Sequence, residues 1–503
     1  MLITILDCYT DEPAGLGVPP YAGTYARYIA GAILDAGHDY YYITIDDLRK
    51  FVSGKEQKGL KTDIRIRNLS RSFASVGRIL NKTNLLIIIA GVHTPGKYLG
   101  AVPGTTKEVL DLLGVKCPKI LTGPAAYGSG LYGGRIARSV ERDLQQFDLV
   151  VPEVEYHLKD LILNNLEADV SAVPKYDDLR RIAVLGAPVV KQFPGYPDII
   201  AEIETSKGCP RKVHCSFCTE GLKFCAMEKR KAEDIIDEVK ALHKQGVRNF
   251  RLGKQSCFYS YGSADEIKKL LKECRQYASV LHIDNANPAM VTEEKTKAIV
   301  KYCTEGNVAA FGVESFDAEV IKRNKLNSTP EQVFEAVKII NKYGAERGEN
   351  GMPKFLPGIN LLYGLIGESR KTHEENFKWL KKMLDDNLLL RRINIRQVAV
   401  FPGTLLANEC GNKFIKKNKK YYWKWRHEIR QKIDSPMLER LVPAGTILRK
   451  VFTEVYDGNT AFGRQIGTYP LIVGIKQRIP LGKYIDVKVT GHMLRSVVGE
   501  IIQ

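Results

Sequence analysis

The stretch Glu202-Ile-Glu-Thr-Ser-Lys-Gly-Cys-Pro-Arg-Lys-Val-His-Cys-Ser-Phe-Cys218 places Cys209, Cys215 and Cys218 on a loop that follows a short strand-like run. Three thiolates are one too few for a closed tetrahedral zinc site, and no suitably spaced fourth cysteine completes a second Cys-x-x-Cys pair. Three do suit a cubane 4Fe-4S cluster with one iron open to an external ligand. We therefore expect an iron–sulfur cluster; a zinc site that adds His214, or a chance spacing, are the alternatives.

This segment resembles the cluster loop of the radical S-adenosylmethionine (radical SAM) superfamily. The resemblance extends to roughly residue 405 through segments that look like successive strand ends of that family's barrel. These segments are Gly253-Lys-Gln, Asn285-Ala-Asn-Pro, Phe311-Gly-Val-Glu-Ser, Asn360-Leu-Leu-Tyr-Gly-Leu-Ile-Gly-Glu and Gln397-Val-Ala-Val-Phe-Pro-Gly-Thr. The chain departs from the family in one respect: five residues, instead of the usual three, separate the first two cysteines.

The resemblance assigns roles to the residues around the cluster. The three cysteines would hold a 4Fe-4S cluster whose open iron binds S-adenosylmethionine (SAM), and the electron of the cluster would cleave SAM to methionine and a 5′-deoxyadenosyl radical. The protein's own task is then binding and orientation, because the cofactors carry the radical chemistry. Glu314 is either a contact to SAM or one half of a strand-end salt bridge, and the acidic residue usual after Gly253 is replaced. The implied SAM-binding residues are Phe217, Gly253, Lys254, Gln255, Glu314, Val398 and Phe401.

Overall charge favours acidic partners. Lys and Arg number 75 against 57 Asp and Glu, a net charge of +18 over 503 residues. RNA, an acidic protein or phosphorylated ligands would all suit that excess, and charge alone does not choose among them.

The cysteines and the start of the chain indicate a compartment. The sequence has no secretion signal and no run of about 18 uncharged apolar residues that could span a membrane. Ten scattered cysteines in such a chain favour cluster or metal binding over disulfides. We therefore expect a cytoplasmic protein that neither spans nor binds a membrane.

Residues 1–175 alternate short apolar runs with helical periodicity, which predicts a doubly wound, Rossmann-like parallel sheet. The expected strands are Ile3 to Asp7, Tyr41 to Ile45, Leu85 to Ala90, Lys119 to Leu121 and Leu149 to Val151, with a helix over Tyr25 to Ala36. Ligands on such sheets bind beyond the carboxyl ends of the strands, where the glycine-rich turns of this sequence fall.

These turns resemble the cobalamin-binding domain that precedes the barrel in one class of radical SAM enzymes. The implied cobalamin-binding residues are Gly17, Pro19, Gly91, His93, Thr94, Gly123 and Pro124. The Asp-x-His-x-x-Gly signature that supplies an axial histidine in other cobalamin proteins is absent, as it is from many members of this class. A flavodoxin-like domain without cobalamin is the alternative.

Domains are expected at residues 176–410, a partial (β/α)6 radical SAM barrel, at 411–440, a basic and aromatic helical linker, and at 441–503, a small β-barrel. In the linker, eight Lys and Arg are interleaved with four aromatics from Lys416 to Lys432. An RNA contact would fit that composition. We favour an amphipathic helix whose aromatics pack on the barrel and whose basic face is solvated.

The last segment is rich in strands, with runs at Tyr469 to Ile475, Tyr484 to Thr490 and Ser496 to Ile501 that suffice for a small antiparallel barrel. Its Gly482-Lys-Tyr-Ile-Asp-Val-Lys-Val-Thr-Gly run resembles the TRAM domain, a β-barrel that often binds RNA. A barrel that clamps a protein substrate, or one that only caps the fold, fits the same pattern.

With cobalamin, the resemblance implies a radical SAM methyltransferase that C-methylates an unactivated carbon. The chain is most similar to an archaeal group of such proteins, and similar enzymes of methanogens methylate the α subunit of methyl-coenzyme M reductase. Glutamine C-methylation there is the specific expectation. We expect a macromolecular substrate, a protein rather than an RNA, and a reductant such as ferredoxin or flavodoxin.

Two other functions remain open. A barrel followed by a TRAM-like tail also suits methylthiotransfer to tRNA, but those enzymes hold a second cluster on three N-terminal cysteines, and this chain has only Cys8 and Cys117 before Cys209. A non-catalytic iron–sulfur protein that binds RNA or a partner is the third possibility. Release of 5′-deoxyadenosine from SAM distinguishes an enzyme from that protein.

Overall fold

The computed structural model describes residues 1–9, 21–55, 68–91, 102–112, 114–130, 135–170, 175–224 and 226–502. The chain forms two compact units, each described by itself: unit 1 comprises residues 1–132, 137–203 and 230–250, and unit 2 comprises residues 133–136, 204–229 and 251–503. Among the described residues, no helix combines the length and the apolar character needed to cross a membrane.

Unit 1 contains a five-stranded, fully parallel sheet in the order β3-β1-β4-β5-β8. The strands are β1 (Leu2–Asp7), β3 (Asp39–Thr44), β4 (Leu85–Ile89), β5 (Lys119–Thr122) and β8 (Leu149–Val150). Strand order reverses between β1 and β4, which is the switch point of a doubly wound fold. The sheet predicted from the sequence is confirmed, with every expected strand within two residues of its place.

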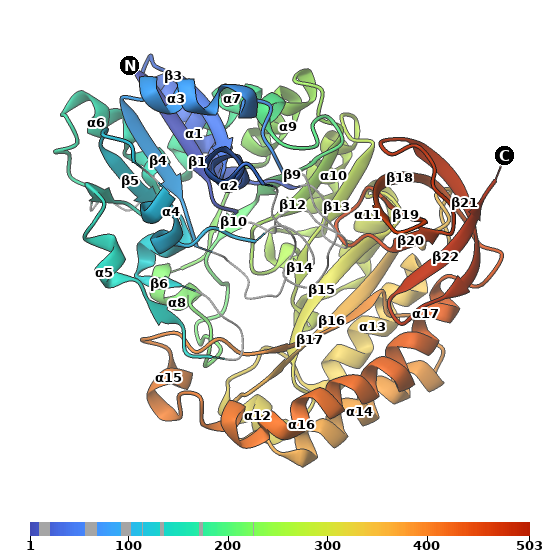
Figure 1. The fold of residues 1–503 in the computed structure, drawn as a ribbon. Coiled ribbons are helices and arrows are strands. Elements are labelled where there is room, and N and C mark those ends of the chain that lie inside the picture. The colour runs from blue at the N-terminus through green and yellow to red at the C-terminus, as the bar shows by residue number, and fades with distance from the viewer. Residues whose placement is uncertain are drawn as a thin grey trace. The chain divides into compact units, whose positions relative to one another are not determined.

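Helices cover both faces of this sheet, as Figure 1 shows for α1 and α2. The helices of unit 1 are α1 (Thr24–Asp35), α2 (Ile45–Ser53), α3 (Val76–Lys82), α4 (Thr106–Leu112), α5 (Glu141–Leu144), α6 (Leu158–Leu163), α7 (Leu179–Leu185) and α9 (Ala232–Lys244). Leu48, Ile79 and Val109, from α2, α3 and α4, share a buried cluster with Leu6 and Ile88 of the sheet. Burial of these apolar side chains supplies most of the force that assembles the layers.

Two glycines let α1 and α7 pack unusually closely. A Cβ at Gly31 of α1 would clash with the carbonyl of Ile182, and a Cβ at Gly186, directly after α7, would clash with the carbonyl of Arg27. Beside this contact the buried carboxylate of Glu238 on α9 pairs with two buried cations, Arg27 and Arg230. Close backbone contact between α1 and α7, together with the buried ion pairs of Glu238, therefore fixes how these helices pack.

Unit 2 is built on an incomplete barrel of parallel strands. Its strands are β9 (Ile200–Glu204) and β12 (Asn249–Gly253), whose last residues lie in this unit, then β13 (Val280–Ile283), β14 (Asn285–Ala286), β15 (Asn307–Glu314), β16 (Phe355–Tyr363) and β17 (Arg392–Gln397). Parallel pairing joins β14, β15, β16 and β17 in that order. Counting β13 and β14 as one interrupted strand, this is the expected partial (β/α)6 barrel.

The helices between these strands begin at clear sequence signals. They are α10 (Ala264–Arg275), α11 (Glu293–Tyr302), α12 (Ala318–Arg323), α13 (Pro330–Gly344) and α14 (Arg370–Asp385). Ser263 and Thr329 form capping boxes with Glu266 and Gln332. Such boxes satisfy the free amides of the first helical turn, so each helix starts at a defined residue.

The linker predicted over residues 411–440 is helical. It consists of α16 (Lys413–Ile429), a π-helical turn η8 (Arg430–Asp434) and α17 (Ser435–Leu441), after the short α15 (Leu405–Glu409). The prediction that its aromatics pack on the barrel is half right: Tyr422 and Trp425 are buried, whereas Tyr421 and Trp423 are exposed. Helical spacing places those two pairs on different faces.

The C-terminal strands close into a small barrel in the order β18-β19-β20-β22-β21. They are β18 (Ile447–Asp457), β19 (Thr460–Gln465), β20 (Ile472–Ile475), β21 (Tyr484–His492) and β22 (Ser496–Ile501). The expectation of an antiparallel barrel needs one correction, because β20 pairs with β22 in parallel. Alternation along a strand reveals which face is buried but not the direction of its neighbour.

Candidate functional site

The three cysteines lie on one long loop that is tied at its base. β10 (Ser206–Lys207) and β11 (Glu228–Lys229) pair antiparallel and hold the two ends of the loop together. Gly208 begins the loop with φ +73°, and a Cβ there would clash with the carbonyl of Ala226. Glycine is required at this turn because both its conformation and the close backbone approach exclude a side chain.

Asn324, at the end of α12, anchors the middle of this loop. Its backbone carbonyl accepts a hydrogen bond from the amide of Ser216 at 2.9 Å, and its side-chain oxygen accepts one from the Ser216 hydroxyl at 2.7 Å. The same carboxamide bonds the amide and the carbonyl of Ile366. The residue between Cys215 and Phe217 is therefore fixed to the loop that follows β16.

Arg211 supplies the positive charge nearest the thiols. Its guanidinium donates to Sγ of Cys215 at 3.2 Å and to the carbonyls of Lys325 and Leu326. Burial, with a smaller contribution from the charges of the neighbouring thiolates, raises the pKa of Cys215 to about 11 and that of Cys218 to about 12. Three partly buried thiols whose thiolates repel one another are a donor set that needs positive metal to be stable.

The zinc alternative gains no support from the described residues. Among the described residues no three His, Cys, Asp or Glu side chains converge as ligands of one ion. His214, the extra ligand of the zinc alternative, packs its ring against Gly221. In a cubane each thiolate holds its own iron, so three separated thiols on one loop fit a cluster.

Unpaired polar atoms lie at the ends of β9 and β12, in the predicted SAM turn. Oε1 of Gln255 and Oγ1 of Thr205 are buried without a hydrogen-bond partner among the described residues. Lys254 between Gly253 and Gln255 has φ +53°, and its ammonium lies 3.6 Å from the carboxylate of Glu204. A buried polar atom without a partner is costly, which marks this turn as a place for a polar ligand.

Glu314 ends β15 in a strained conformation, with φ +64° after a β-bulge. Burial raises the pKa of its carboxyl to about 8, and the charge of Arg396 on β17 opposes that rise. The charge of Glu314 also acts on Cys215, so it faces the cysteine loop. Strained backbone and a displaced pKa together are common at ligand sites.

The apolar side of the site is one cluster formed by loops after β16 and β17. Val398 is buried in it, and Cys215 and Phe217 pack against it. Gly364, with φ +101°, lies so close to Val398 and Ile415 that a Cβ would contact both. The carbonyl of Phe401 accepts the Thr404 hydroxyl at 2.7 Å. The structure thus brings the cysteine loop and the predicted SAM-binding residues Phe217 and Val398 into one cluster. The roles of all the predicted SAM-binding residues stay predictions.

The predicted cobalamin residues are only partly described. Gly17, Pro19, His93 and Thr94 lie outside the described residues. Gly91 follows β4, and Gly123 and Pro124 follow β5, so all three lie at the carboxyl edge of the sheet. The turns after β4 and β5 touch, because the amide of Ala125 donates to the carbonyl of Ala90 at 2.9 Å. That edge is where doubly wound sheets bind ligands.

Sequence reasoning missed three residues around the site. Asn324 and Arg211 fix the cysteine loop, and Glu368 is a buried carboxylate that accepts from Asn418 at 2.8 Å and from the amide of Gly364. Arg211 lies inside the quoted cysteine loop, and Glu368 is the last residue of the quoted segment 360–368, so the sequence indicated the position of each but not its side-chain contacts. Asn324 carries no sequence signal, because it acts through contacts made by distant segments.

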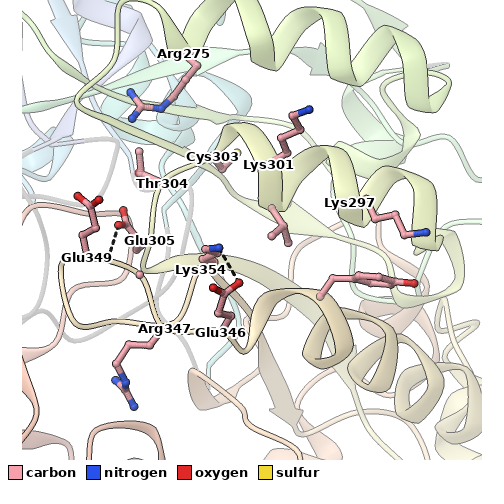
Figure 2. A pocket seen from close by; sticks show the side chains of 13 residues that line it. Arg275, Lys297, Lys301, Cys303, Thr304, Glu305, Glu346, Arg347, Glu349 and Lys354 are labelled. Carbon is pink, nitrogen blue, oxygen red and sulfur yellow. Dashed lines mark hydrogen bonds and ion pairs between the residues drawn. The ribbon is translucent and has the colours of Figure 1, made fainter.

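A separate pocket of about 710 Å³ lies at the other ends of the barrel strands (Figure 2). Its lining includes Glu305, just before β15, and Lys354, just before β16, whereas the predicted site follows the ends of these strands. Eight residues of strand separate the two ends of β15 by about 25 Å. Lys354 is paired with Glu346 in the pocket wall. This pocket is therefore not the cofactor site.

Comparison with known proteins shows which family model and which proteins this chain resembles. Residues 203–380 match the model of the Radical SAM superfamily. An uncharacterized protein of Methanocaldococcus jannaschii is 45% identical, over 99% of this chain and 93% of that protein. One of Archaeoglobus fulgidus is 37% identical, over 99% and 89%. A ribosomal protein uS12 methylthiotransferase RimO of Phocaeicola vulgatus is 24% identical, over 70% and 77%.

Among solved structures, the radical SAM methyltransferase TsrM of Kitasatospora setae, with cobalamin and a [4Fe-4S] cluster bound, superposes with TM-score 0.55 and 13% identity, over 80% of this chain and 73% of that one. The cobalamin-dependent SAM radical enzyme OxsB with aqua-cobalamin superposes with TM-score 0.51 and 12% identity, over 85% and 56%. At these identities the likeness shows a shared fold.

Proposed function

Because the chain belongs to one family with the Methanocaldococcus and Archaeoglobus proteins, and its residues 203–380 form a radical SAM domain, we propose that it is a cobalamin-dependent radical SAM methyltransferase. It would C-methylate a carbon that is not activated for nucleophilic attack. The observation that carries the proposal is the loop of three partly buried, mutually repelling thiols beside a strand-end turn with unpaired polar atoms.

The chain's residues have distinct tasks. Cys209, Cys215 and Cys218 would hold a 4Fe-4S cluster, and Asn324 and Arg211 hold their loop in place. The buried oxygen of Gln255 can accept a hydrogen bond from the ammonium group of SAM. This oxygen would take the part of the acidic residue that the family usually has at this turn. Bound together, cluster, SAM and cobalamin supply a hydrogen-abstracting radical and a methyl group, and the protein orients them and excludes water.

Cobalamin is supported by the fold of unit 1 and by the neighbours. The parallel sheet offers the carboxyl ends of β1, β4 and β5, where Gly91, Gly123 and Pro124 lie. TsrM and OxsB, whose structures were solved with cobalamin bound, have a fold similar to that of this chain. A cobalamin held there would be bound largely by backbone turns, in keeping with the missing axial-histidine signature.

For the substrate we propose a protein, and specifically a glutamine of the α subunit of methyl-coenzyme M reductase. No residue of the candidate site identifies this protein as the substrate. The 45% identical relative comes from Methanocaldococcus, in keeping with a target in methanogens. Deletion of the gene followed by mass analysis of the reductase peptides tests it: the glutamine peptide should become lighter by one CH2 unit, because hydrogen replaces the methyl group. An unchanged peptide would rule this target out.

The activity itself is tested on anaerobically purified full-length chain. Cobalt and the 4Fe-4S cluster should each be present in equimolar amount, and reduction in the presence of SAM should release 5′-deoxyadenosine. Cys209→Ala, Cys215→Ala and Cys218→Ala should each abolish that release. Cys117→Ala, a partly buried cysteine of unit 1, is the matched control and should retain it. An intact cluster without cobalt, or release that survives Cys215→Ala, contradicts the proposal.

Methylthiotransfer is the second candidate, favoured by the RimO relative. The N-terminal cysteines argue against it, because a second cluster needs three and only Cys8 and Cys117 precede Cys209. Cys8 is in addition buried in the core of the sheet. The product mass decides, since a methylthio group adds sulfur and a methyl group does not. A cluster-bearing chain that never releases 5′-deoxyadenosine would instead support the non-catalytic binding protein.

A further inference from the structure

Helix α16 has one buried and one strongly basic face. Ile415, Asn418, Tyr422, Trp425 and Ile429 are buried at helical spacing. The other face carries six exposed lysines, Lys413, Lys416, Lys417, Lys419, Lys420 and Lys424. We call these lysines, together with the exposed Tyr421 and Trp423, the α16 surface.

No carboxylate of the described residues forms an ion pair with this surface, although the charge of Lys417 acts on the buried carboxyl of Glu368. The sequence contains no Asp or Glu between Glu409 and Glu428, and none of the six lysines forms an ion pair with a carboxylate of the described residues. The neighbouring helix α14 differs, because three of its five exposed cations are paired: Arg370 with Glu374, Lys378 with Glu375 and Lys381 with Asp385. The charge of the α16 surface therefore remains available for an external anion.

Two aromatic rings are held among these lysines. Trp423 is 56% exposed and Tyr421 is 43% exposed. Tyr421 stacks on the buried Trp425, with ring centroids 5.6 Å apart. Trp423 contacts Tyr422 edge to face at 5.2 Å, and the guanidinium of Arg426 lies 5.4 Å from its centroid. The ammonium of Lys420 also lies 4.9 Å from the centroid of Tyr421. Rings that are held by their neighbours and still partly exposed lose little freedom when a planar group stacks on them.

We propose that the α16 surface binds single-stranded nucleic acid. Lysines contact the phosphates while exposed rings stack on bases, which is the combination that single-strand binding uses. An acidic protein fits less well, because protein interfaces are depleted in lysine. A membrane surface fits less well too, because the apolar face of α16 is already buried in unit 2.

The surface starts beside the candidate site. Ile415 contacts the Gly364 turn, and Asn418 donates to the buried carboxylate of Glu368 at 2.8 Å. A strand bound along α16 would thus run close to the loops that surround the cysteines. The inference goes beyond methyl transfer and does not depend on it, since binding is measured without SAM, cobalamin or turnover.

The test uses the full chain and short fluorescein-labelled oligouridylate or oligodeoxythymidylate, with affinity measured by anisotropy over a series of salt concentrations. Lys419→Ala/Lys420→Ala should lower the slope of log affinity against log salt by about 1.4, roughly 0.7 for each lost phosphate contact. Trp423→Ala should weaken binding roughly 5- to 100-fold at an unchanged slope. The paired lysines of α14 supply the control, Lys378→Ala/Lys381→Ala, which should change neither quantity.

Thermal unfolding of each variant confirms that the fold is retained, which is expected because all these side chains are exposed. Absence of binding by the wild-type chain at low salt, or equal effects from the α14 and α16 lysine variants, overturns the proposal. An unchanged affinity of Trp423→Ala, with polyglutamate competing as strongly as the oligonucleotide, overturns it in favour of an acidic protein. The uridylate and thymidylate arms tell whether RNA or DNA is preferred.

Discussion

Asn324 and Ser216 join the cysteine loop to the rest of the barrel through two hydrogen bonds, of 2.9 Å from amide to carbonyl and 2.7 Å from hydroxyl to carboxamide oxygen. Both residues are buried. Ser216 lies between two of the three cysteines, so the position of the thiols depends on a residue more than a hundred positions away.

Asn324→Ala should therefore lower the iron retained after reconstitution and destabilise unit 2 by about 1–3 kcal/mol, because buried partners lose their bonds. Iron and acid-labile sulfide per chain, with denaturant unfolding, measure both effects. Asn341→Ala is the control: it also removes a carboxamide that bridges two segments, at Val337 and Leu389, but remote from the cysteines. It should lower stability while leaving iron content unchanged. Equal iron loss in both variants would contradict a specific role for Asn324.

Glu368 should make stability depend on pH. Burial raises the pKa of its carboxyl from 4.5 to about 7. The folded chain therefore holds a proton that the unfolded chain releases, so the contribution is fully present below pH 4.5 and is lost as pH rises through 7. At about 1.4 kcal/mol for each pKa unit, the loss is roughly 3 kcal/mol.

Glu368→Gln removes this titration and keeps an oxygen that can accept from Gly364. Compared with the wild-type chain, the variant should gain relative stability as pH rises from 5 to 8, measured by urea unfolding at each pH. The exposed Glu374→Gln should follow the wild-type pH profile. A variant whose difference from wild type is independent of pH would show that Glu368 is ionised throughout.

Gly31 tests the packing of α1 on α7. Because a Cβ at this position would meet backbone instead of a movable side chain, Gly31→Ala should destabilise unit 1 by about 3 kcal/mol. Gly114→Ala is the control, since a Cβ there meets nothing within 4 Å. Melting temperatures of the two variants compare them directly; equal values would mean that the helices separate at little cost.

The sequence predicted the layers better than the contacts between them. Apolar runs located β1, β3, β4, β5 and β8 because parallel buried strands read as continuous hydrophobic stretches. The cysteine spacing located the cluster loop because the chemistry needs those residue types.

Other features were out of reach of a sequence pattern. The positive φ of Lys254 and Glu314 corresponds to no local sequence pattern, since neither residue type favours that conformation. The parallel pairing of β20 with β22 depends on barrel closure. The burial of only two of four linker aromatics followed from which face of α16 meets the unit. Each is a tertiary effect that overrides local preference.

His282 should link acid stability to the attachment of the small barrel. Its Nδ1 accepts a hydrogen bond from the amide of Thr468 at 3.1 Å, so its Nε2 carries the proton that is donated to the carbonyl of Glu305 at 3.2 Å. Burial lowers the pKa of this imidazole from 6.5 to about 4. Between pH 6.5 and pH 4 the imidazole of His282 is protonated in the unfolded chain but neutral in the folded chain. Its contribution to the stability of the folded chain is therefore fully present above pH 6.5. It is lost as pH falls through 4, by at most about 3 kcal/mol.

Hydrogen exchange of residues 466–471, measured at pH 7 and pH 5 and corrected for intrinsic rates, should show protection falling with acid. His282→Gln, whose amide can replace both hydrogen bonds without titrating, should show protection that does not change between the two pH values. The exposed His427→Gln is the control and should behave as the wild-type chain does. If His282→Gln retains the full acid sensitivity, another group controls the attachment, and the buried imidazole serves only to join Thr468 to Glu305.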